Sequence, residues 1–159
     1  MKRWAGYFQQ DVGYVQGDAA IRHDDGAFTF HGRSDEVINV GGNRVGTEEI
    51  ENALLTDTER FGSPLRNCAV VGMPDDVLGT VPVAFVVLQP GSKYTSTDEG
   101  RLRSLVQYRL GSVAVPAKFI VAGALPETYS GKFMRALLKK MLADMPLGDL
   151  GALKNIDCV

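Results

Sequence analysis

Lys132 is the residue whose type and position most directly suggest chemistry. It follows the Ser130-Gly131 pair in the stretch PETYSGKFMR, where a helix over residues 131–143 is expected to begin. An ammonium group at that point adds to the positive end of the helix dipole, which favours anions. The alternative is an ordinary solvated lysine, which is the more common outcome for a lone lysine on a polar face.

The expected helix directs Lys132 away from the protein core. Its apolar residues repeat at helical spacing and must face a sheet; they are Met134, Leu137, Leu138, Met141 and Leu142. At about 100° per residue, Lys132 falls nearly opposite the centre of this stripe. Arg135, Lys139 and Lys140 continue the basic side. Spacing alone therefore predicts an exposed, well-positioned lysine.

Four other polar residues are candidates for ligand binding, and each has a common structural alternative. Asp18 suits a turn, and Asp35 suits an ordinary loop. Arg33 and Arg44 are of the residue type that most often forms surface salt bridges. Taken singly, none of the four indicates a binding site.

Turn residues divide the first part of the chain into two strand pairs. The stretch GYVQGDAAIRHDDGAFTFHGR predicts two strands joined by the Asp-Asp-Gly turn at 24–26, because Asp-Gly pairs favour hairpin turns. The stretch DEVINVGGNRVG predicts a second, shorter pair folded around the two glycines at 41–42. Thr47 is then expected to be the N-cap of a helix in TEEIENALL.

The remaining pattern predicts a small sheet that carries helices. Residues 67–73 and 80–88 are short, β-branched and nearly continuous apolar runs, which resemble strands covered on both faces. A second helix follows in STDEGRLRSLVQYRL, with Gly111 as its C′ residue, then a strand in AKFIVAG and the helix over 131–143. The predicted fold class is therefore α+β, with a small sheet, three helices and a preceding β-hairpin.

Composition excludes several classes of function. With 159 residues, the chain can bury a core sufficient for one domain, or one domain plus a fragment. A formal net charge of −2 gives no basic field for nucleic acids, and no apolar run approaches the roughly 20 residues of a membrane span. His23 and His31 have no metal-ligand neighbours. Cys68 and Cys158 form no C-x-x-C motif and predict two reduced thiols in a cytoplasmic protein.

Four motifs, in order, resemble those of the AMP-forming acyl-CoA synthetases. LPETYSGKFMR is similar to the family's closing motif, Leu-Pro-Lys-Thr-Arg-Ser-Gly-Lys-Ile-Met-Arg. The stretch from YVQGDAA to EEIENAL is similar to its Tyr-x-x-Gly-Asp, Gly-Arg-x-Asp and Gly-x-Arg-x-x-x-x-Glu-Ile-Glu segments. The resemblance covers residue 12 to the end, including the LGDLGAL tail typical of acetyl- and propionyl-CoA synthetases. The tail and PETYSGK are also similar to the synthetase part of propionyl-CoA synthase, a multifunctional fusion protein.

The resemblance implies a two-step ligase reaction. Such enzymes join a short-chain carboxylate to the α-phosphate of ATP, expel pyrophosphate, and pass the acyl group from AMP to the thiol of CoA. Lys132 is implied to be the catalytic lysine at the junction of carboxylate and phosphate, where a cation lowers the repulsion between two anions. The implied cofactors are ATP/AMP, CoA and Mg²⁺, with the metal held mainly by the phosphates and by a domain absent from this chain.

Three residues match the family's nucleotide-binding positions. Asp18 matches the aspartate that accepts hydrogen bonds from both ribose hydroxyls, because a carboxylate offers two acceptor oxygens to a cis-diol. Arg33 matches the arginine near the ribose. Arg44 matches the arginine near the phosphates, where a guanidinium fork is a natural partner.

The resemblance also implies a mobile lid. Asp35 matches the hinge about which the family's C-terminal domain swings. One pose inserts the lysine for adenylation, and the other brings the face of the second strand pair to the CoA tunnel. Gly41 and Gly42 would lie on that CoA-binding face, where missing side chains let the backbone approach the pantetheine arm.

The implied organisation has three parts. Residues 1–34 would be the last hairpin of a large N-terminal adenylation domain, residues 35–145 the lid domain, and residues 146–159 a tail. The implied partners are that N-terminal domain of the same protein, the carboxylate and CoA, with no nucleic acid or membrane. The phosphate loop, acyl pocket and adenine site are expected in the N-terminal domain. We therefore expect the isolated chain to fold but not to turn over, because proximity has been lost.

The chain departs from the family's pattern at several positions. Glu127 and Tyr129 replace the usual Lys and Arg beside the catalytic lysine, which removes two positive charges. Gln107 stands where acetyl-CoA synthetases carry an arginine that contacts CoA, so the contacts with CoA are expected to differ. Gly41 replaces a common serine, and Asn43 a common histidine.

Two other functions stay open at the level of sequence. The chain could be a non-catalytic docking or regulatory module, in which an exposed Lys132 is a target for acylation. Alternatively, it could belong to an adenylation enzyme that loads a carrier-protein thiol. The LGDLGAL tail argues against this second alternative.

Overall fold

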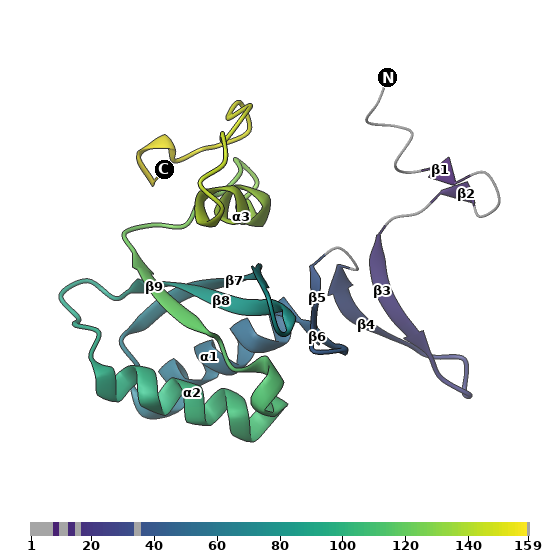
Figure 1. Cartoon of the computed structure of the whole chain (residues 1–159), viewed down its shortest axis with the longest axis horizontal. Helices are drawn as coiled ribbons and strands as arrows, with labels where there is room; N and C mark the ends of the chain where they lie inside the picture. The colour runs from purple at the N-terminus through teal and green to yellow at the C-terminus, as the bar shows by residue number, and fades with distance from the viewer. Residues whose placement is uncertain (1–7, 10–12, 15–16, 34–35, 159) are drawn as a thin grey trace. The chain divides into compact units, whose positions relative to one another are not determined.

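The computed structural model describes residues 8–9, 13–14, 17–33 and 36–158 of the chain. These residues fall into two units, Met1–Val37 and Ile38–Val159 (Figure 1). All three α-helices of the described residues lie in the second unit, which also contains Lys132.

The first unit is built from two antiparallel strand pairs. β1 (Phe8–Gln9) pairs with β2 (Gly13–Tyr14), and β3 (Asp18–Arg22) pairs with β4 (Phe28–Arg33). Gly26 has φ = 85° in the turn between β3 and β4, a conformation that glycine adopts without steric cost. The hairpin expected around the Asp-Asp-Gly turn is confirmed, whereas the sequence pattern does not indicate the β1–β2 pair.

A five-stranded mixed sheet forms the centre of the second unit (Figure 1). β8 (Gly79–Leu88) is antiparallel to β7 (Leu65–Asp75) along its whole length and parallel to β9 (Lys118–Ala122) at its other edge. β5 (Val37–Val40) is antiparallel to the start of β8, and β6 (Asn43–Gly46) pairs with β5. The predicted strands in the 67–73 and 80–88 runs are therefore confirmed as the two longest strands of the sheet.

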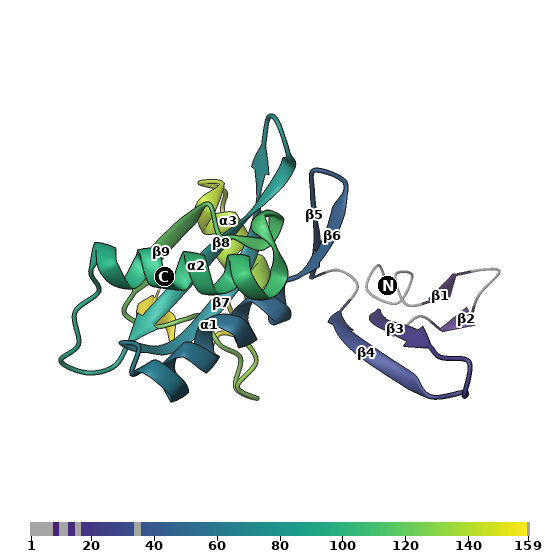
Figure 2. The same ribbon diagram turned by 90° about the horizontal axis from the view of Figure 1, so that it is seen from below.

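Three helices cover the two faces of this sheet. α1 (Thr47–Phe61) and α2 (Ser96–Leu110) pack on one face, and α3 (Arg135–Leu142) packs on the other (Figures 1 and 2). Two short 3₁₀ helices are also present. η1 (Ser112–Ala114) directly follows α2, and η2 (Ile156–Cys158) ends the described chain. The predicted α+β class, with three helices on a small sheet, is confirmed.

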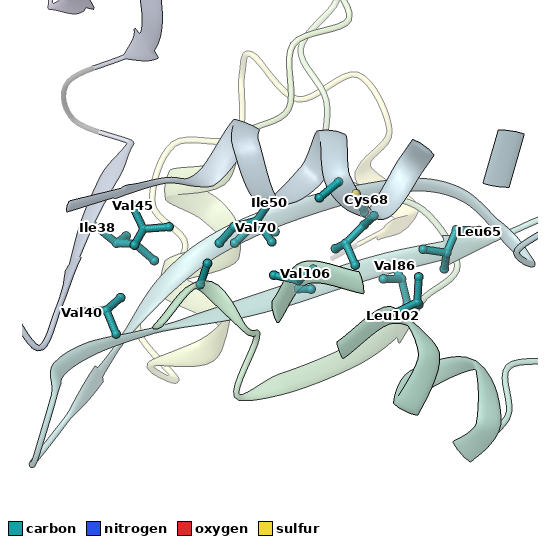
Figure 3. Packing of buried hydrophobic residues seen from close by; sticks show 14 residues of the cluster. Ile38, Val40, Val45, Ile50, Leu65, Cys68, Val70, Val86, Leu102 and Val106 are labelled. Atoms are coloured by element: carbon teal, nitrogen blue, oxygen red, sulfur yellow. The ribbon is translucent and has the colours of Figure 1, made fainter. Parts of the chain in front are cut away.

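The strands β7 and β8 are buried on both faces because successive side chains point to opposite sides of a sheet. In β7, Cys68 and Val70 face α1 and α2, whereas Ala69 and Val71 face α3. The cluster that α1 and α2 cover, named here the cluster below α1 and α2 with the sheet as its far side, includes Ile38, Val40, Val45, Ile50, Leu65, Val86, Leu102 and Val106 (Figure 3). Complete burial of a Val or Leu side chain contributes about 1.5–3 kcal/mol, so these two clusters hold the three layers together.

The helix starts differ in how well the sequence predicts them. α2 begins with a capping box, in which the N–H of Asp98 donates to the Thr95 hydroxyl and the Asp98 carboxylate accepts the Thr95 N–H at 3.0 Å. Gly111 ends α2 with φ = 87°, but as the C-cap residue and not as the predicted C′ residue. The expected N-cap role of Thr47 is wrong, because Gly46 occupies that position in the extended conformation of β6. The Thr47 hydroxyl is instead buried, with no hydrogen-bond partner among the described residues.

The third helix is shorter than predicted, because it spans Arg135–Leu142 and not 131–143. Residues 127–133 form a tight hairpin, named here the Lys132 hairpin, whose two ends are joined by an antiparallel β-bridge. Gly131 has φ = 80° in this hairpin, a value that suits a turn and cannot continue a right-handed helix.

The inward face of α3 is also narrower than predicted. Leu137 and Leu138 are buried and Leu142 packs against the same cluster, as expected, but Met141 is 38% exposed. A helix of eight residues makes little more than two turns, so only one narrow row of side chains reaches the sheet.

Candidate functional site

Lys132 lies in the Lys132 hairpin with its side chain exposed. The Lys132 carbonyl accepts the Thr128 N–H at 2.9 Å, and the Lys132 N–H donates to the Thr128 hydroxyl at 3.2 Å. The Gly131 N–H donates to the Thr128 carbonyl at 2.8 Å, and the hydroxyls of Thr128 and Ser130 are 2.9 Å apart. Thr128 therefore fixes the backbone that carries the lysine.

This position corrects the expectation that a helix terminus carries Lys132. α3 begins only at Arg135, and the intervening Phe133 and Met134 are not helical. The field of a helix dipole falls off within the first turn, so it does not set the environment of this ammonium group. Among the described residues, the ammonium group of Lys132 forms no ion pair, which leaves its charge available to an anion.

Gly41 and Gly42 form the turn of the β5–β6 hairpin, as predicted, with φ values of 56° and 88°. The Gly41 N–H donates to the Leu78 carbonyl at 2.9 Å, which ties this turn to the connection between β7 and β8. A Cβ atom on Gly41 would approach Leu78 Cδ2 to 3.2 Å, whereas one on Gly42 would meet no described atom within 4 Å. Gly42 therefore presents bare backbone to its surroundings.

Arg44 belongs to the same hairpin as the glycine turn, and its side chain is exposed. The next residue, Val45, is buried in the cluster below α1 and α2. Phe133, the neighbour of Lys132, packs against the cluster on the α3 side. The structure therefore brings the glycine turn and Arg44 together, and it supports Lys132 from the opposite face of the sheet.

The residues expected near the ribose are partners in the backbone register of the β3–β4 pair. Asp18 begins β3 and lies opposite Arg33, which ends β4, and the Asp18 side chain is exposed. The register shifts between Asp18 and Ala20, an irregularity of the kind that redirects side chains near strand ends. The expected hinge, Asp35, lies outside the described residues.

A buried ion pair that the sequence pattern does not indicate joins α1 to α3. Arg135 donates from Nη2 to Glu51 Oε2 at 2.7 Å and from Nε to Glu51 Oε1 at 3.1 Å. The two side chains are only 16% and 10% exposed. Glu51 Oε1 also accepts the backbone N–H of Val70 at 2.7 Å. Because β7 is an edge strand among the described residues, this bond satisfies a donor that none of their strands accepts.

The expectation that Arg135 continues an exposed basic side is therefore wrong. Its guanidinium group points inward because it bonds to the Glu51 carboxylate, which lies at the free edge of β7. One signal in the sequence is the acidic Glu51 directly after the apolar Ile50, which is buried in α1. Its partner lies 84 residues further along the chain, so helical periodicity could not identify it.

Neither cysteine is a candidate nucleophile. Burial raises the pKa of the Cys68 thiol far above its usual range, and the nearby Glu51 carboxylate raises it further. Burial likewise raises the pKa of the Cys158 thiol, and both cysteines are free. A protonated, desolvated thiol is a poor nucleophile, so Lys132 remains the strongest candidate for chemistry in the second unit.

Within the part of the chain that the structure describes, no three His, Cys, Asp or Glu side chains gather as metal ligands. His23 instead shares a hydrogen bond with the Thr29 hydroxyl across the β3–β4 hairpin. No helix among the described residues has both the length and the apolar character that crossing a membrane requires.

Known proteins resemble this chain in sequence and in fold. Residues 49–132 match the family described as the AMP-binding enzyme C-terminal domain. The chain is 42% identical over 142 residues to the acetyl-coenzyme A synthetase of Pyrobaculum aerophilum. This match covers 89% of this chain and 20% of that protein. It is 41% identical over 152 residues to an acetyl-coenzyme A synthetase of Pseudomonas aeruginosa, covering 94% of this chain and 23% of that protein.

Among solved structures, the acetoacetyl-CoA synthetase from Streptomyces lividans is similar in fold. The match covers 99% of this chain and 23% of the chain of that synthetase. The TM-score is 0.81 and the identity 25%. This chain thus spans about a fifth of the length of the curated relatives it matches. The narrower resemblance to propionyl-CoA synthase stays a prediction, as do the roles assigned to individual site residues.

Proposed function

This chain belongs to the AMP-binding enzyme C-terminal domain family, and we propose that it is the C-terminal part of an AMP-forming acyl-CoA synthetase. The complete enzyme activates a short-chain carboxylate with ATP to an acyl-AMP and then transfers the acyl group to CoA. The observation that carries this proposal is the Lys132 hairpin. Its backbone is fixed by Thr128, and its exposed ammonium group forms no ion pair among the described residues.

The proposed role of Lys132 belongs to the first step. A carboxylate oxygen attacks the α-phosphorus of ATP, and the bond from that phosphorus to the departing pyrophosphate oxygen breaks. Two anions approach each other, so a cation at their junction lowers the repulsion and stabilises the charge of the transition state. A compact ammonium group on a flexible stem suits this transient contact, and the hairpin backbone fixes the point from which it reaches.

The proposed second step uses the other hairpin of the second unit. The thiol sulfur of CoA attacks the acyl carbon, the thiol loses its proton, and AMP leaves. The turn at Gly41 and Gly42 suits the approach of the pantetheine arm, because a Cβ on Gly42 would project into space free of described atoms. Lys132 and this turn are supported from opposite faces of the sheet, which fits a lid that presents one hairpin at a time.

The remaining assignments complete the proposal. Asp18 and Arg33 bind the ribose, Arg44 lies near the phosphates, and Asp35 is the hinge. Residues 1–34 then belong to an N-terminal adenylation domain, 35–145 to the lid and 146–159 to the tail. In this scheme Mg²⁺ is held mainly by the nucleotide phosphates and the N-terminal domain.

Substitution of Lys132 in the complete synthetase tests the proposal. Lys132→Ala should slow ATP–pyrophosphate exchange by about 10²–10³, the usual effect of removing one transition-state contact. Lys139→Ala is the matched control, because Lys139 is an exposed lysine on α3, and it should leave the exchange rate unchanged. Undiminished exchange in the Lys132→Ala enzyme would overturn the proposal.

Two mixing experiments separate the proposal from its alternatives. Adding this chain to the separated N-terminal part should restore activity, and the chain alone should show none. A docking or regulatory module would restore none. Acyl transfer to free CoA supports the synthetase, whereas transfer only to a carrier-protein thiol would favour a carrier-loading enzyme.

A further inference from the structure

The end of the described chain lies along the segment that leads into the Lys132 hairpin. A β-bridge pairs Leu153 with Thr128 in antiparallel orientation. The Lys154 N–H donates to the Glu127 carbonyl at 2.9 Å. Residues 153–155 thus lie beside this segment, joined to it by one isolated β-bridge and one backbone hydrogen bond, and are named here the C-terminal clasp.

Asn155 strengthens this contact with both ends of its side-chain amide. Its Oδ1 accepts the Glu127 N–H at 3.0 Å, and its Nδ2 donates to the Leu125 carbonyl at 2.8 Å. An amide carries both an acceptor and donors, so one side chain here satisfies two backbone groups of opposite kind. Asn155 is the residue of the clasp that makes side-chain hydrogen bonds to the backbone of this segment.

Residues 126–128 form backbone hydrogen bonds on both edges, beside one isolated β-bridge on each side. On one edge, the Pro126 carbonyl accepts the Met134 N–H at 2.8 Å, and the Thr128 N–H donates to the Lys132 carbonyl at 2.9 Å. On the other edge, the N–H and carbonyl of Glu127 bond to the clasp. The same three residues therefore connect the clasp directly to the backbone of Lys132.

The side chains of the clasp show which contacts hold it in place. Leu153 is only 5% exposed and anchors the clasp by its burial. The Lys154 ammonium lies 2.8 Å from the Glu127 carboxylate, but these side chains are 52% and 29% exposed, and such pairs contribute little. Beside the backbone bond from Lys154 to Glu127, the packing of Leu153 and the two hydrogen bonds of Asn155 are therefore the main side-chain contacts.

We propose that Asn155 is a positioning residue for Lys132, and that the C-terminal clasp holds the Lys132 hairpin in the geometry that adenylation requires. This inference rests on the proposed function, because it assigns Lys132 to the first step. The second step uses the glycine turn of the β5–β6 hairpin, whose Gly41 N–H donates to Leu78 and not to the clasp. Loosening the clasp should therefore slow adenylation and spare acyl transfer.

Amide hydrogen exchange on the 159-residue chain tests the structural half of the inference. Asn155→Ala should accelerate exchange at the Thr128 and Lys132 amides by about 10-fold, because Leu125 and Glu127 each lose a hydrogen bond. Asn52→Ala is the matched control, because it removes an exposed amide group from α1, and it should leave both rates unchanged. Unchanged exchange in the Asn155→Ala chain overturns the inference, whatever reaction the protein catalyses.

The two half-reactions of the complete synthetase test the functional half. Asn155→Ala should lower kcat for ATP–pyrophosphate exchange by about 10–100-fold and leave KM for the carboxylate nearly unchanged. Transfer from supplied acyl-AMP to CoA should keep its full rate. Equal loss of both half-reactions, or loss of neither, overturns the positioning role.

The outcome for Lys132→Ala keeps the two proposals distinguishable. If that variant exchanges pyrophosphate normally, the proposed function fails, and hydrogen exchange still decides whether the clasp orders the hairpin. If Lys132→Ala is impaired and Asn155→Ala is not, the proposed function stands and the inference about the clasp fails.

Discussion

Replacing Arg135 by alanine tests whether its buried ion pair with Glu51 holds α3 against the sheet. In the folded chain, the guanidinium group donates two hydrogen bonds to the carboxylate, at 2.7 and 3.1 Å. Its removal leaves a carboxylate that is 10% exposed and still accepts the Val70 N–H. We therefore expect the Arg135→Ala chain to fold but to be less stable.

The size of this loss follows from the burial of the pair. Removing one partner of a buried ion pair costs about 3–5 kcal/mol. The side chains of Arg135 and Glu51 are still 16% and 10% exposed, and Val70 keeps its bond to the carboxylate. The lower end of this range of cost therefore applies. We expect a loss of about 3 kcal/mol in the free energy of unfolding. With a urea m-value of about 1–3 kcal/mol/M, the unfolding midpoint should fall by about 1–3 M.

Urea unfolding of the chain, followed by far-ultraviolet circular dichroism, measures this change, because all described helices lie in Ile38–Val159. The control Lys139→Ala removes an exposed cation from the same helix and should change stability by no more than about 0.5 kcal/mol. Adding Glu51→Gln to Arg135→Ala should recover most of the loss, because a neutral amide accepts the Val70 N–H without burying a charge. Equal midpoints for the two single variants would refute the reasoning.

Two further substitutions test the glycine turn and the start of α2. Gly42→Ala adds a methyl group at φ = 88° in open space, and we expect acyl transfer to CoA to fall about 10-fold or more with pyrophosphate exchange retained. Gly91→Ala imposes the same strain at φ = 77° in equally open space, so equal losses in both variants would count against the CoA role. In α2, the hydroxyl and then the N–H of the N-cap threonine hold the pKa of Asp98 below its usual value. Because the folded-state pKa is depressed, this stabilisation is present above the unfolded pKa of about 3.9 and is lost as the pH falls through the folded value. Asp98→Asn should therefore lower stability by about 0.5 kcal/mol at neutral pH, and a difference in urea midpoint that persists undiminished in acid would contradict this account.

Features that depend on neighbouring residues are predictable from the sequence of this chain. The turns at 24–26 and 41–42 need positive φ, which glycine supplies, and both hairpins are present. The continuous apolar runs of β7 and β8 predict strands buried on both faces, and two clusters cover them. The end of α2 at Gly111 follows the same local logic.

The motifs also identify the family, because chemistry requires particular residue types at particular spacings. The resemblance inferred from LPETYSGKFMR and the upstream segments agrees with the family match over residues 49–132. The roles of Asp18, Arg33, Arg44 and Lys132 stay predictions until the substitutions above are made.

Contacts between distant parts of the chain decided what the sequence left undetermined. Periodicity placed Lys132 on a helix, whereas Gly131 turns the chain into a hairpin there, and residues 127–128 of this hairpin pair with the remote C-terminal clasp. Periodicity likewise placed Arg135 in solvent, whereas a carboxylate 84 residues away draws it inward. The physical reason is the same in both cases. Local patterns record the preferences of neighbouring residues, and a hydrogen bond or ion pair between remote segments exists only after the sheet has brought them together.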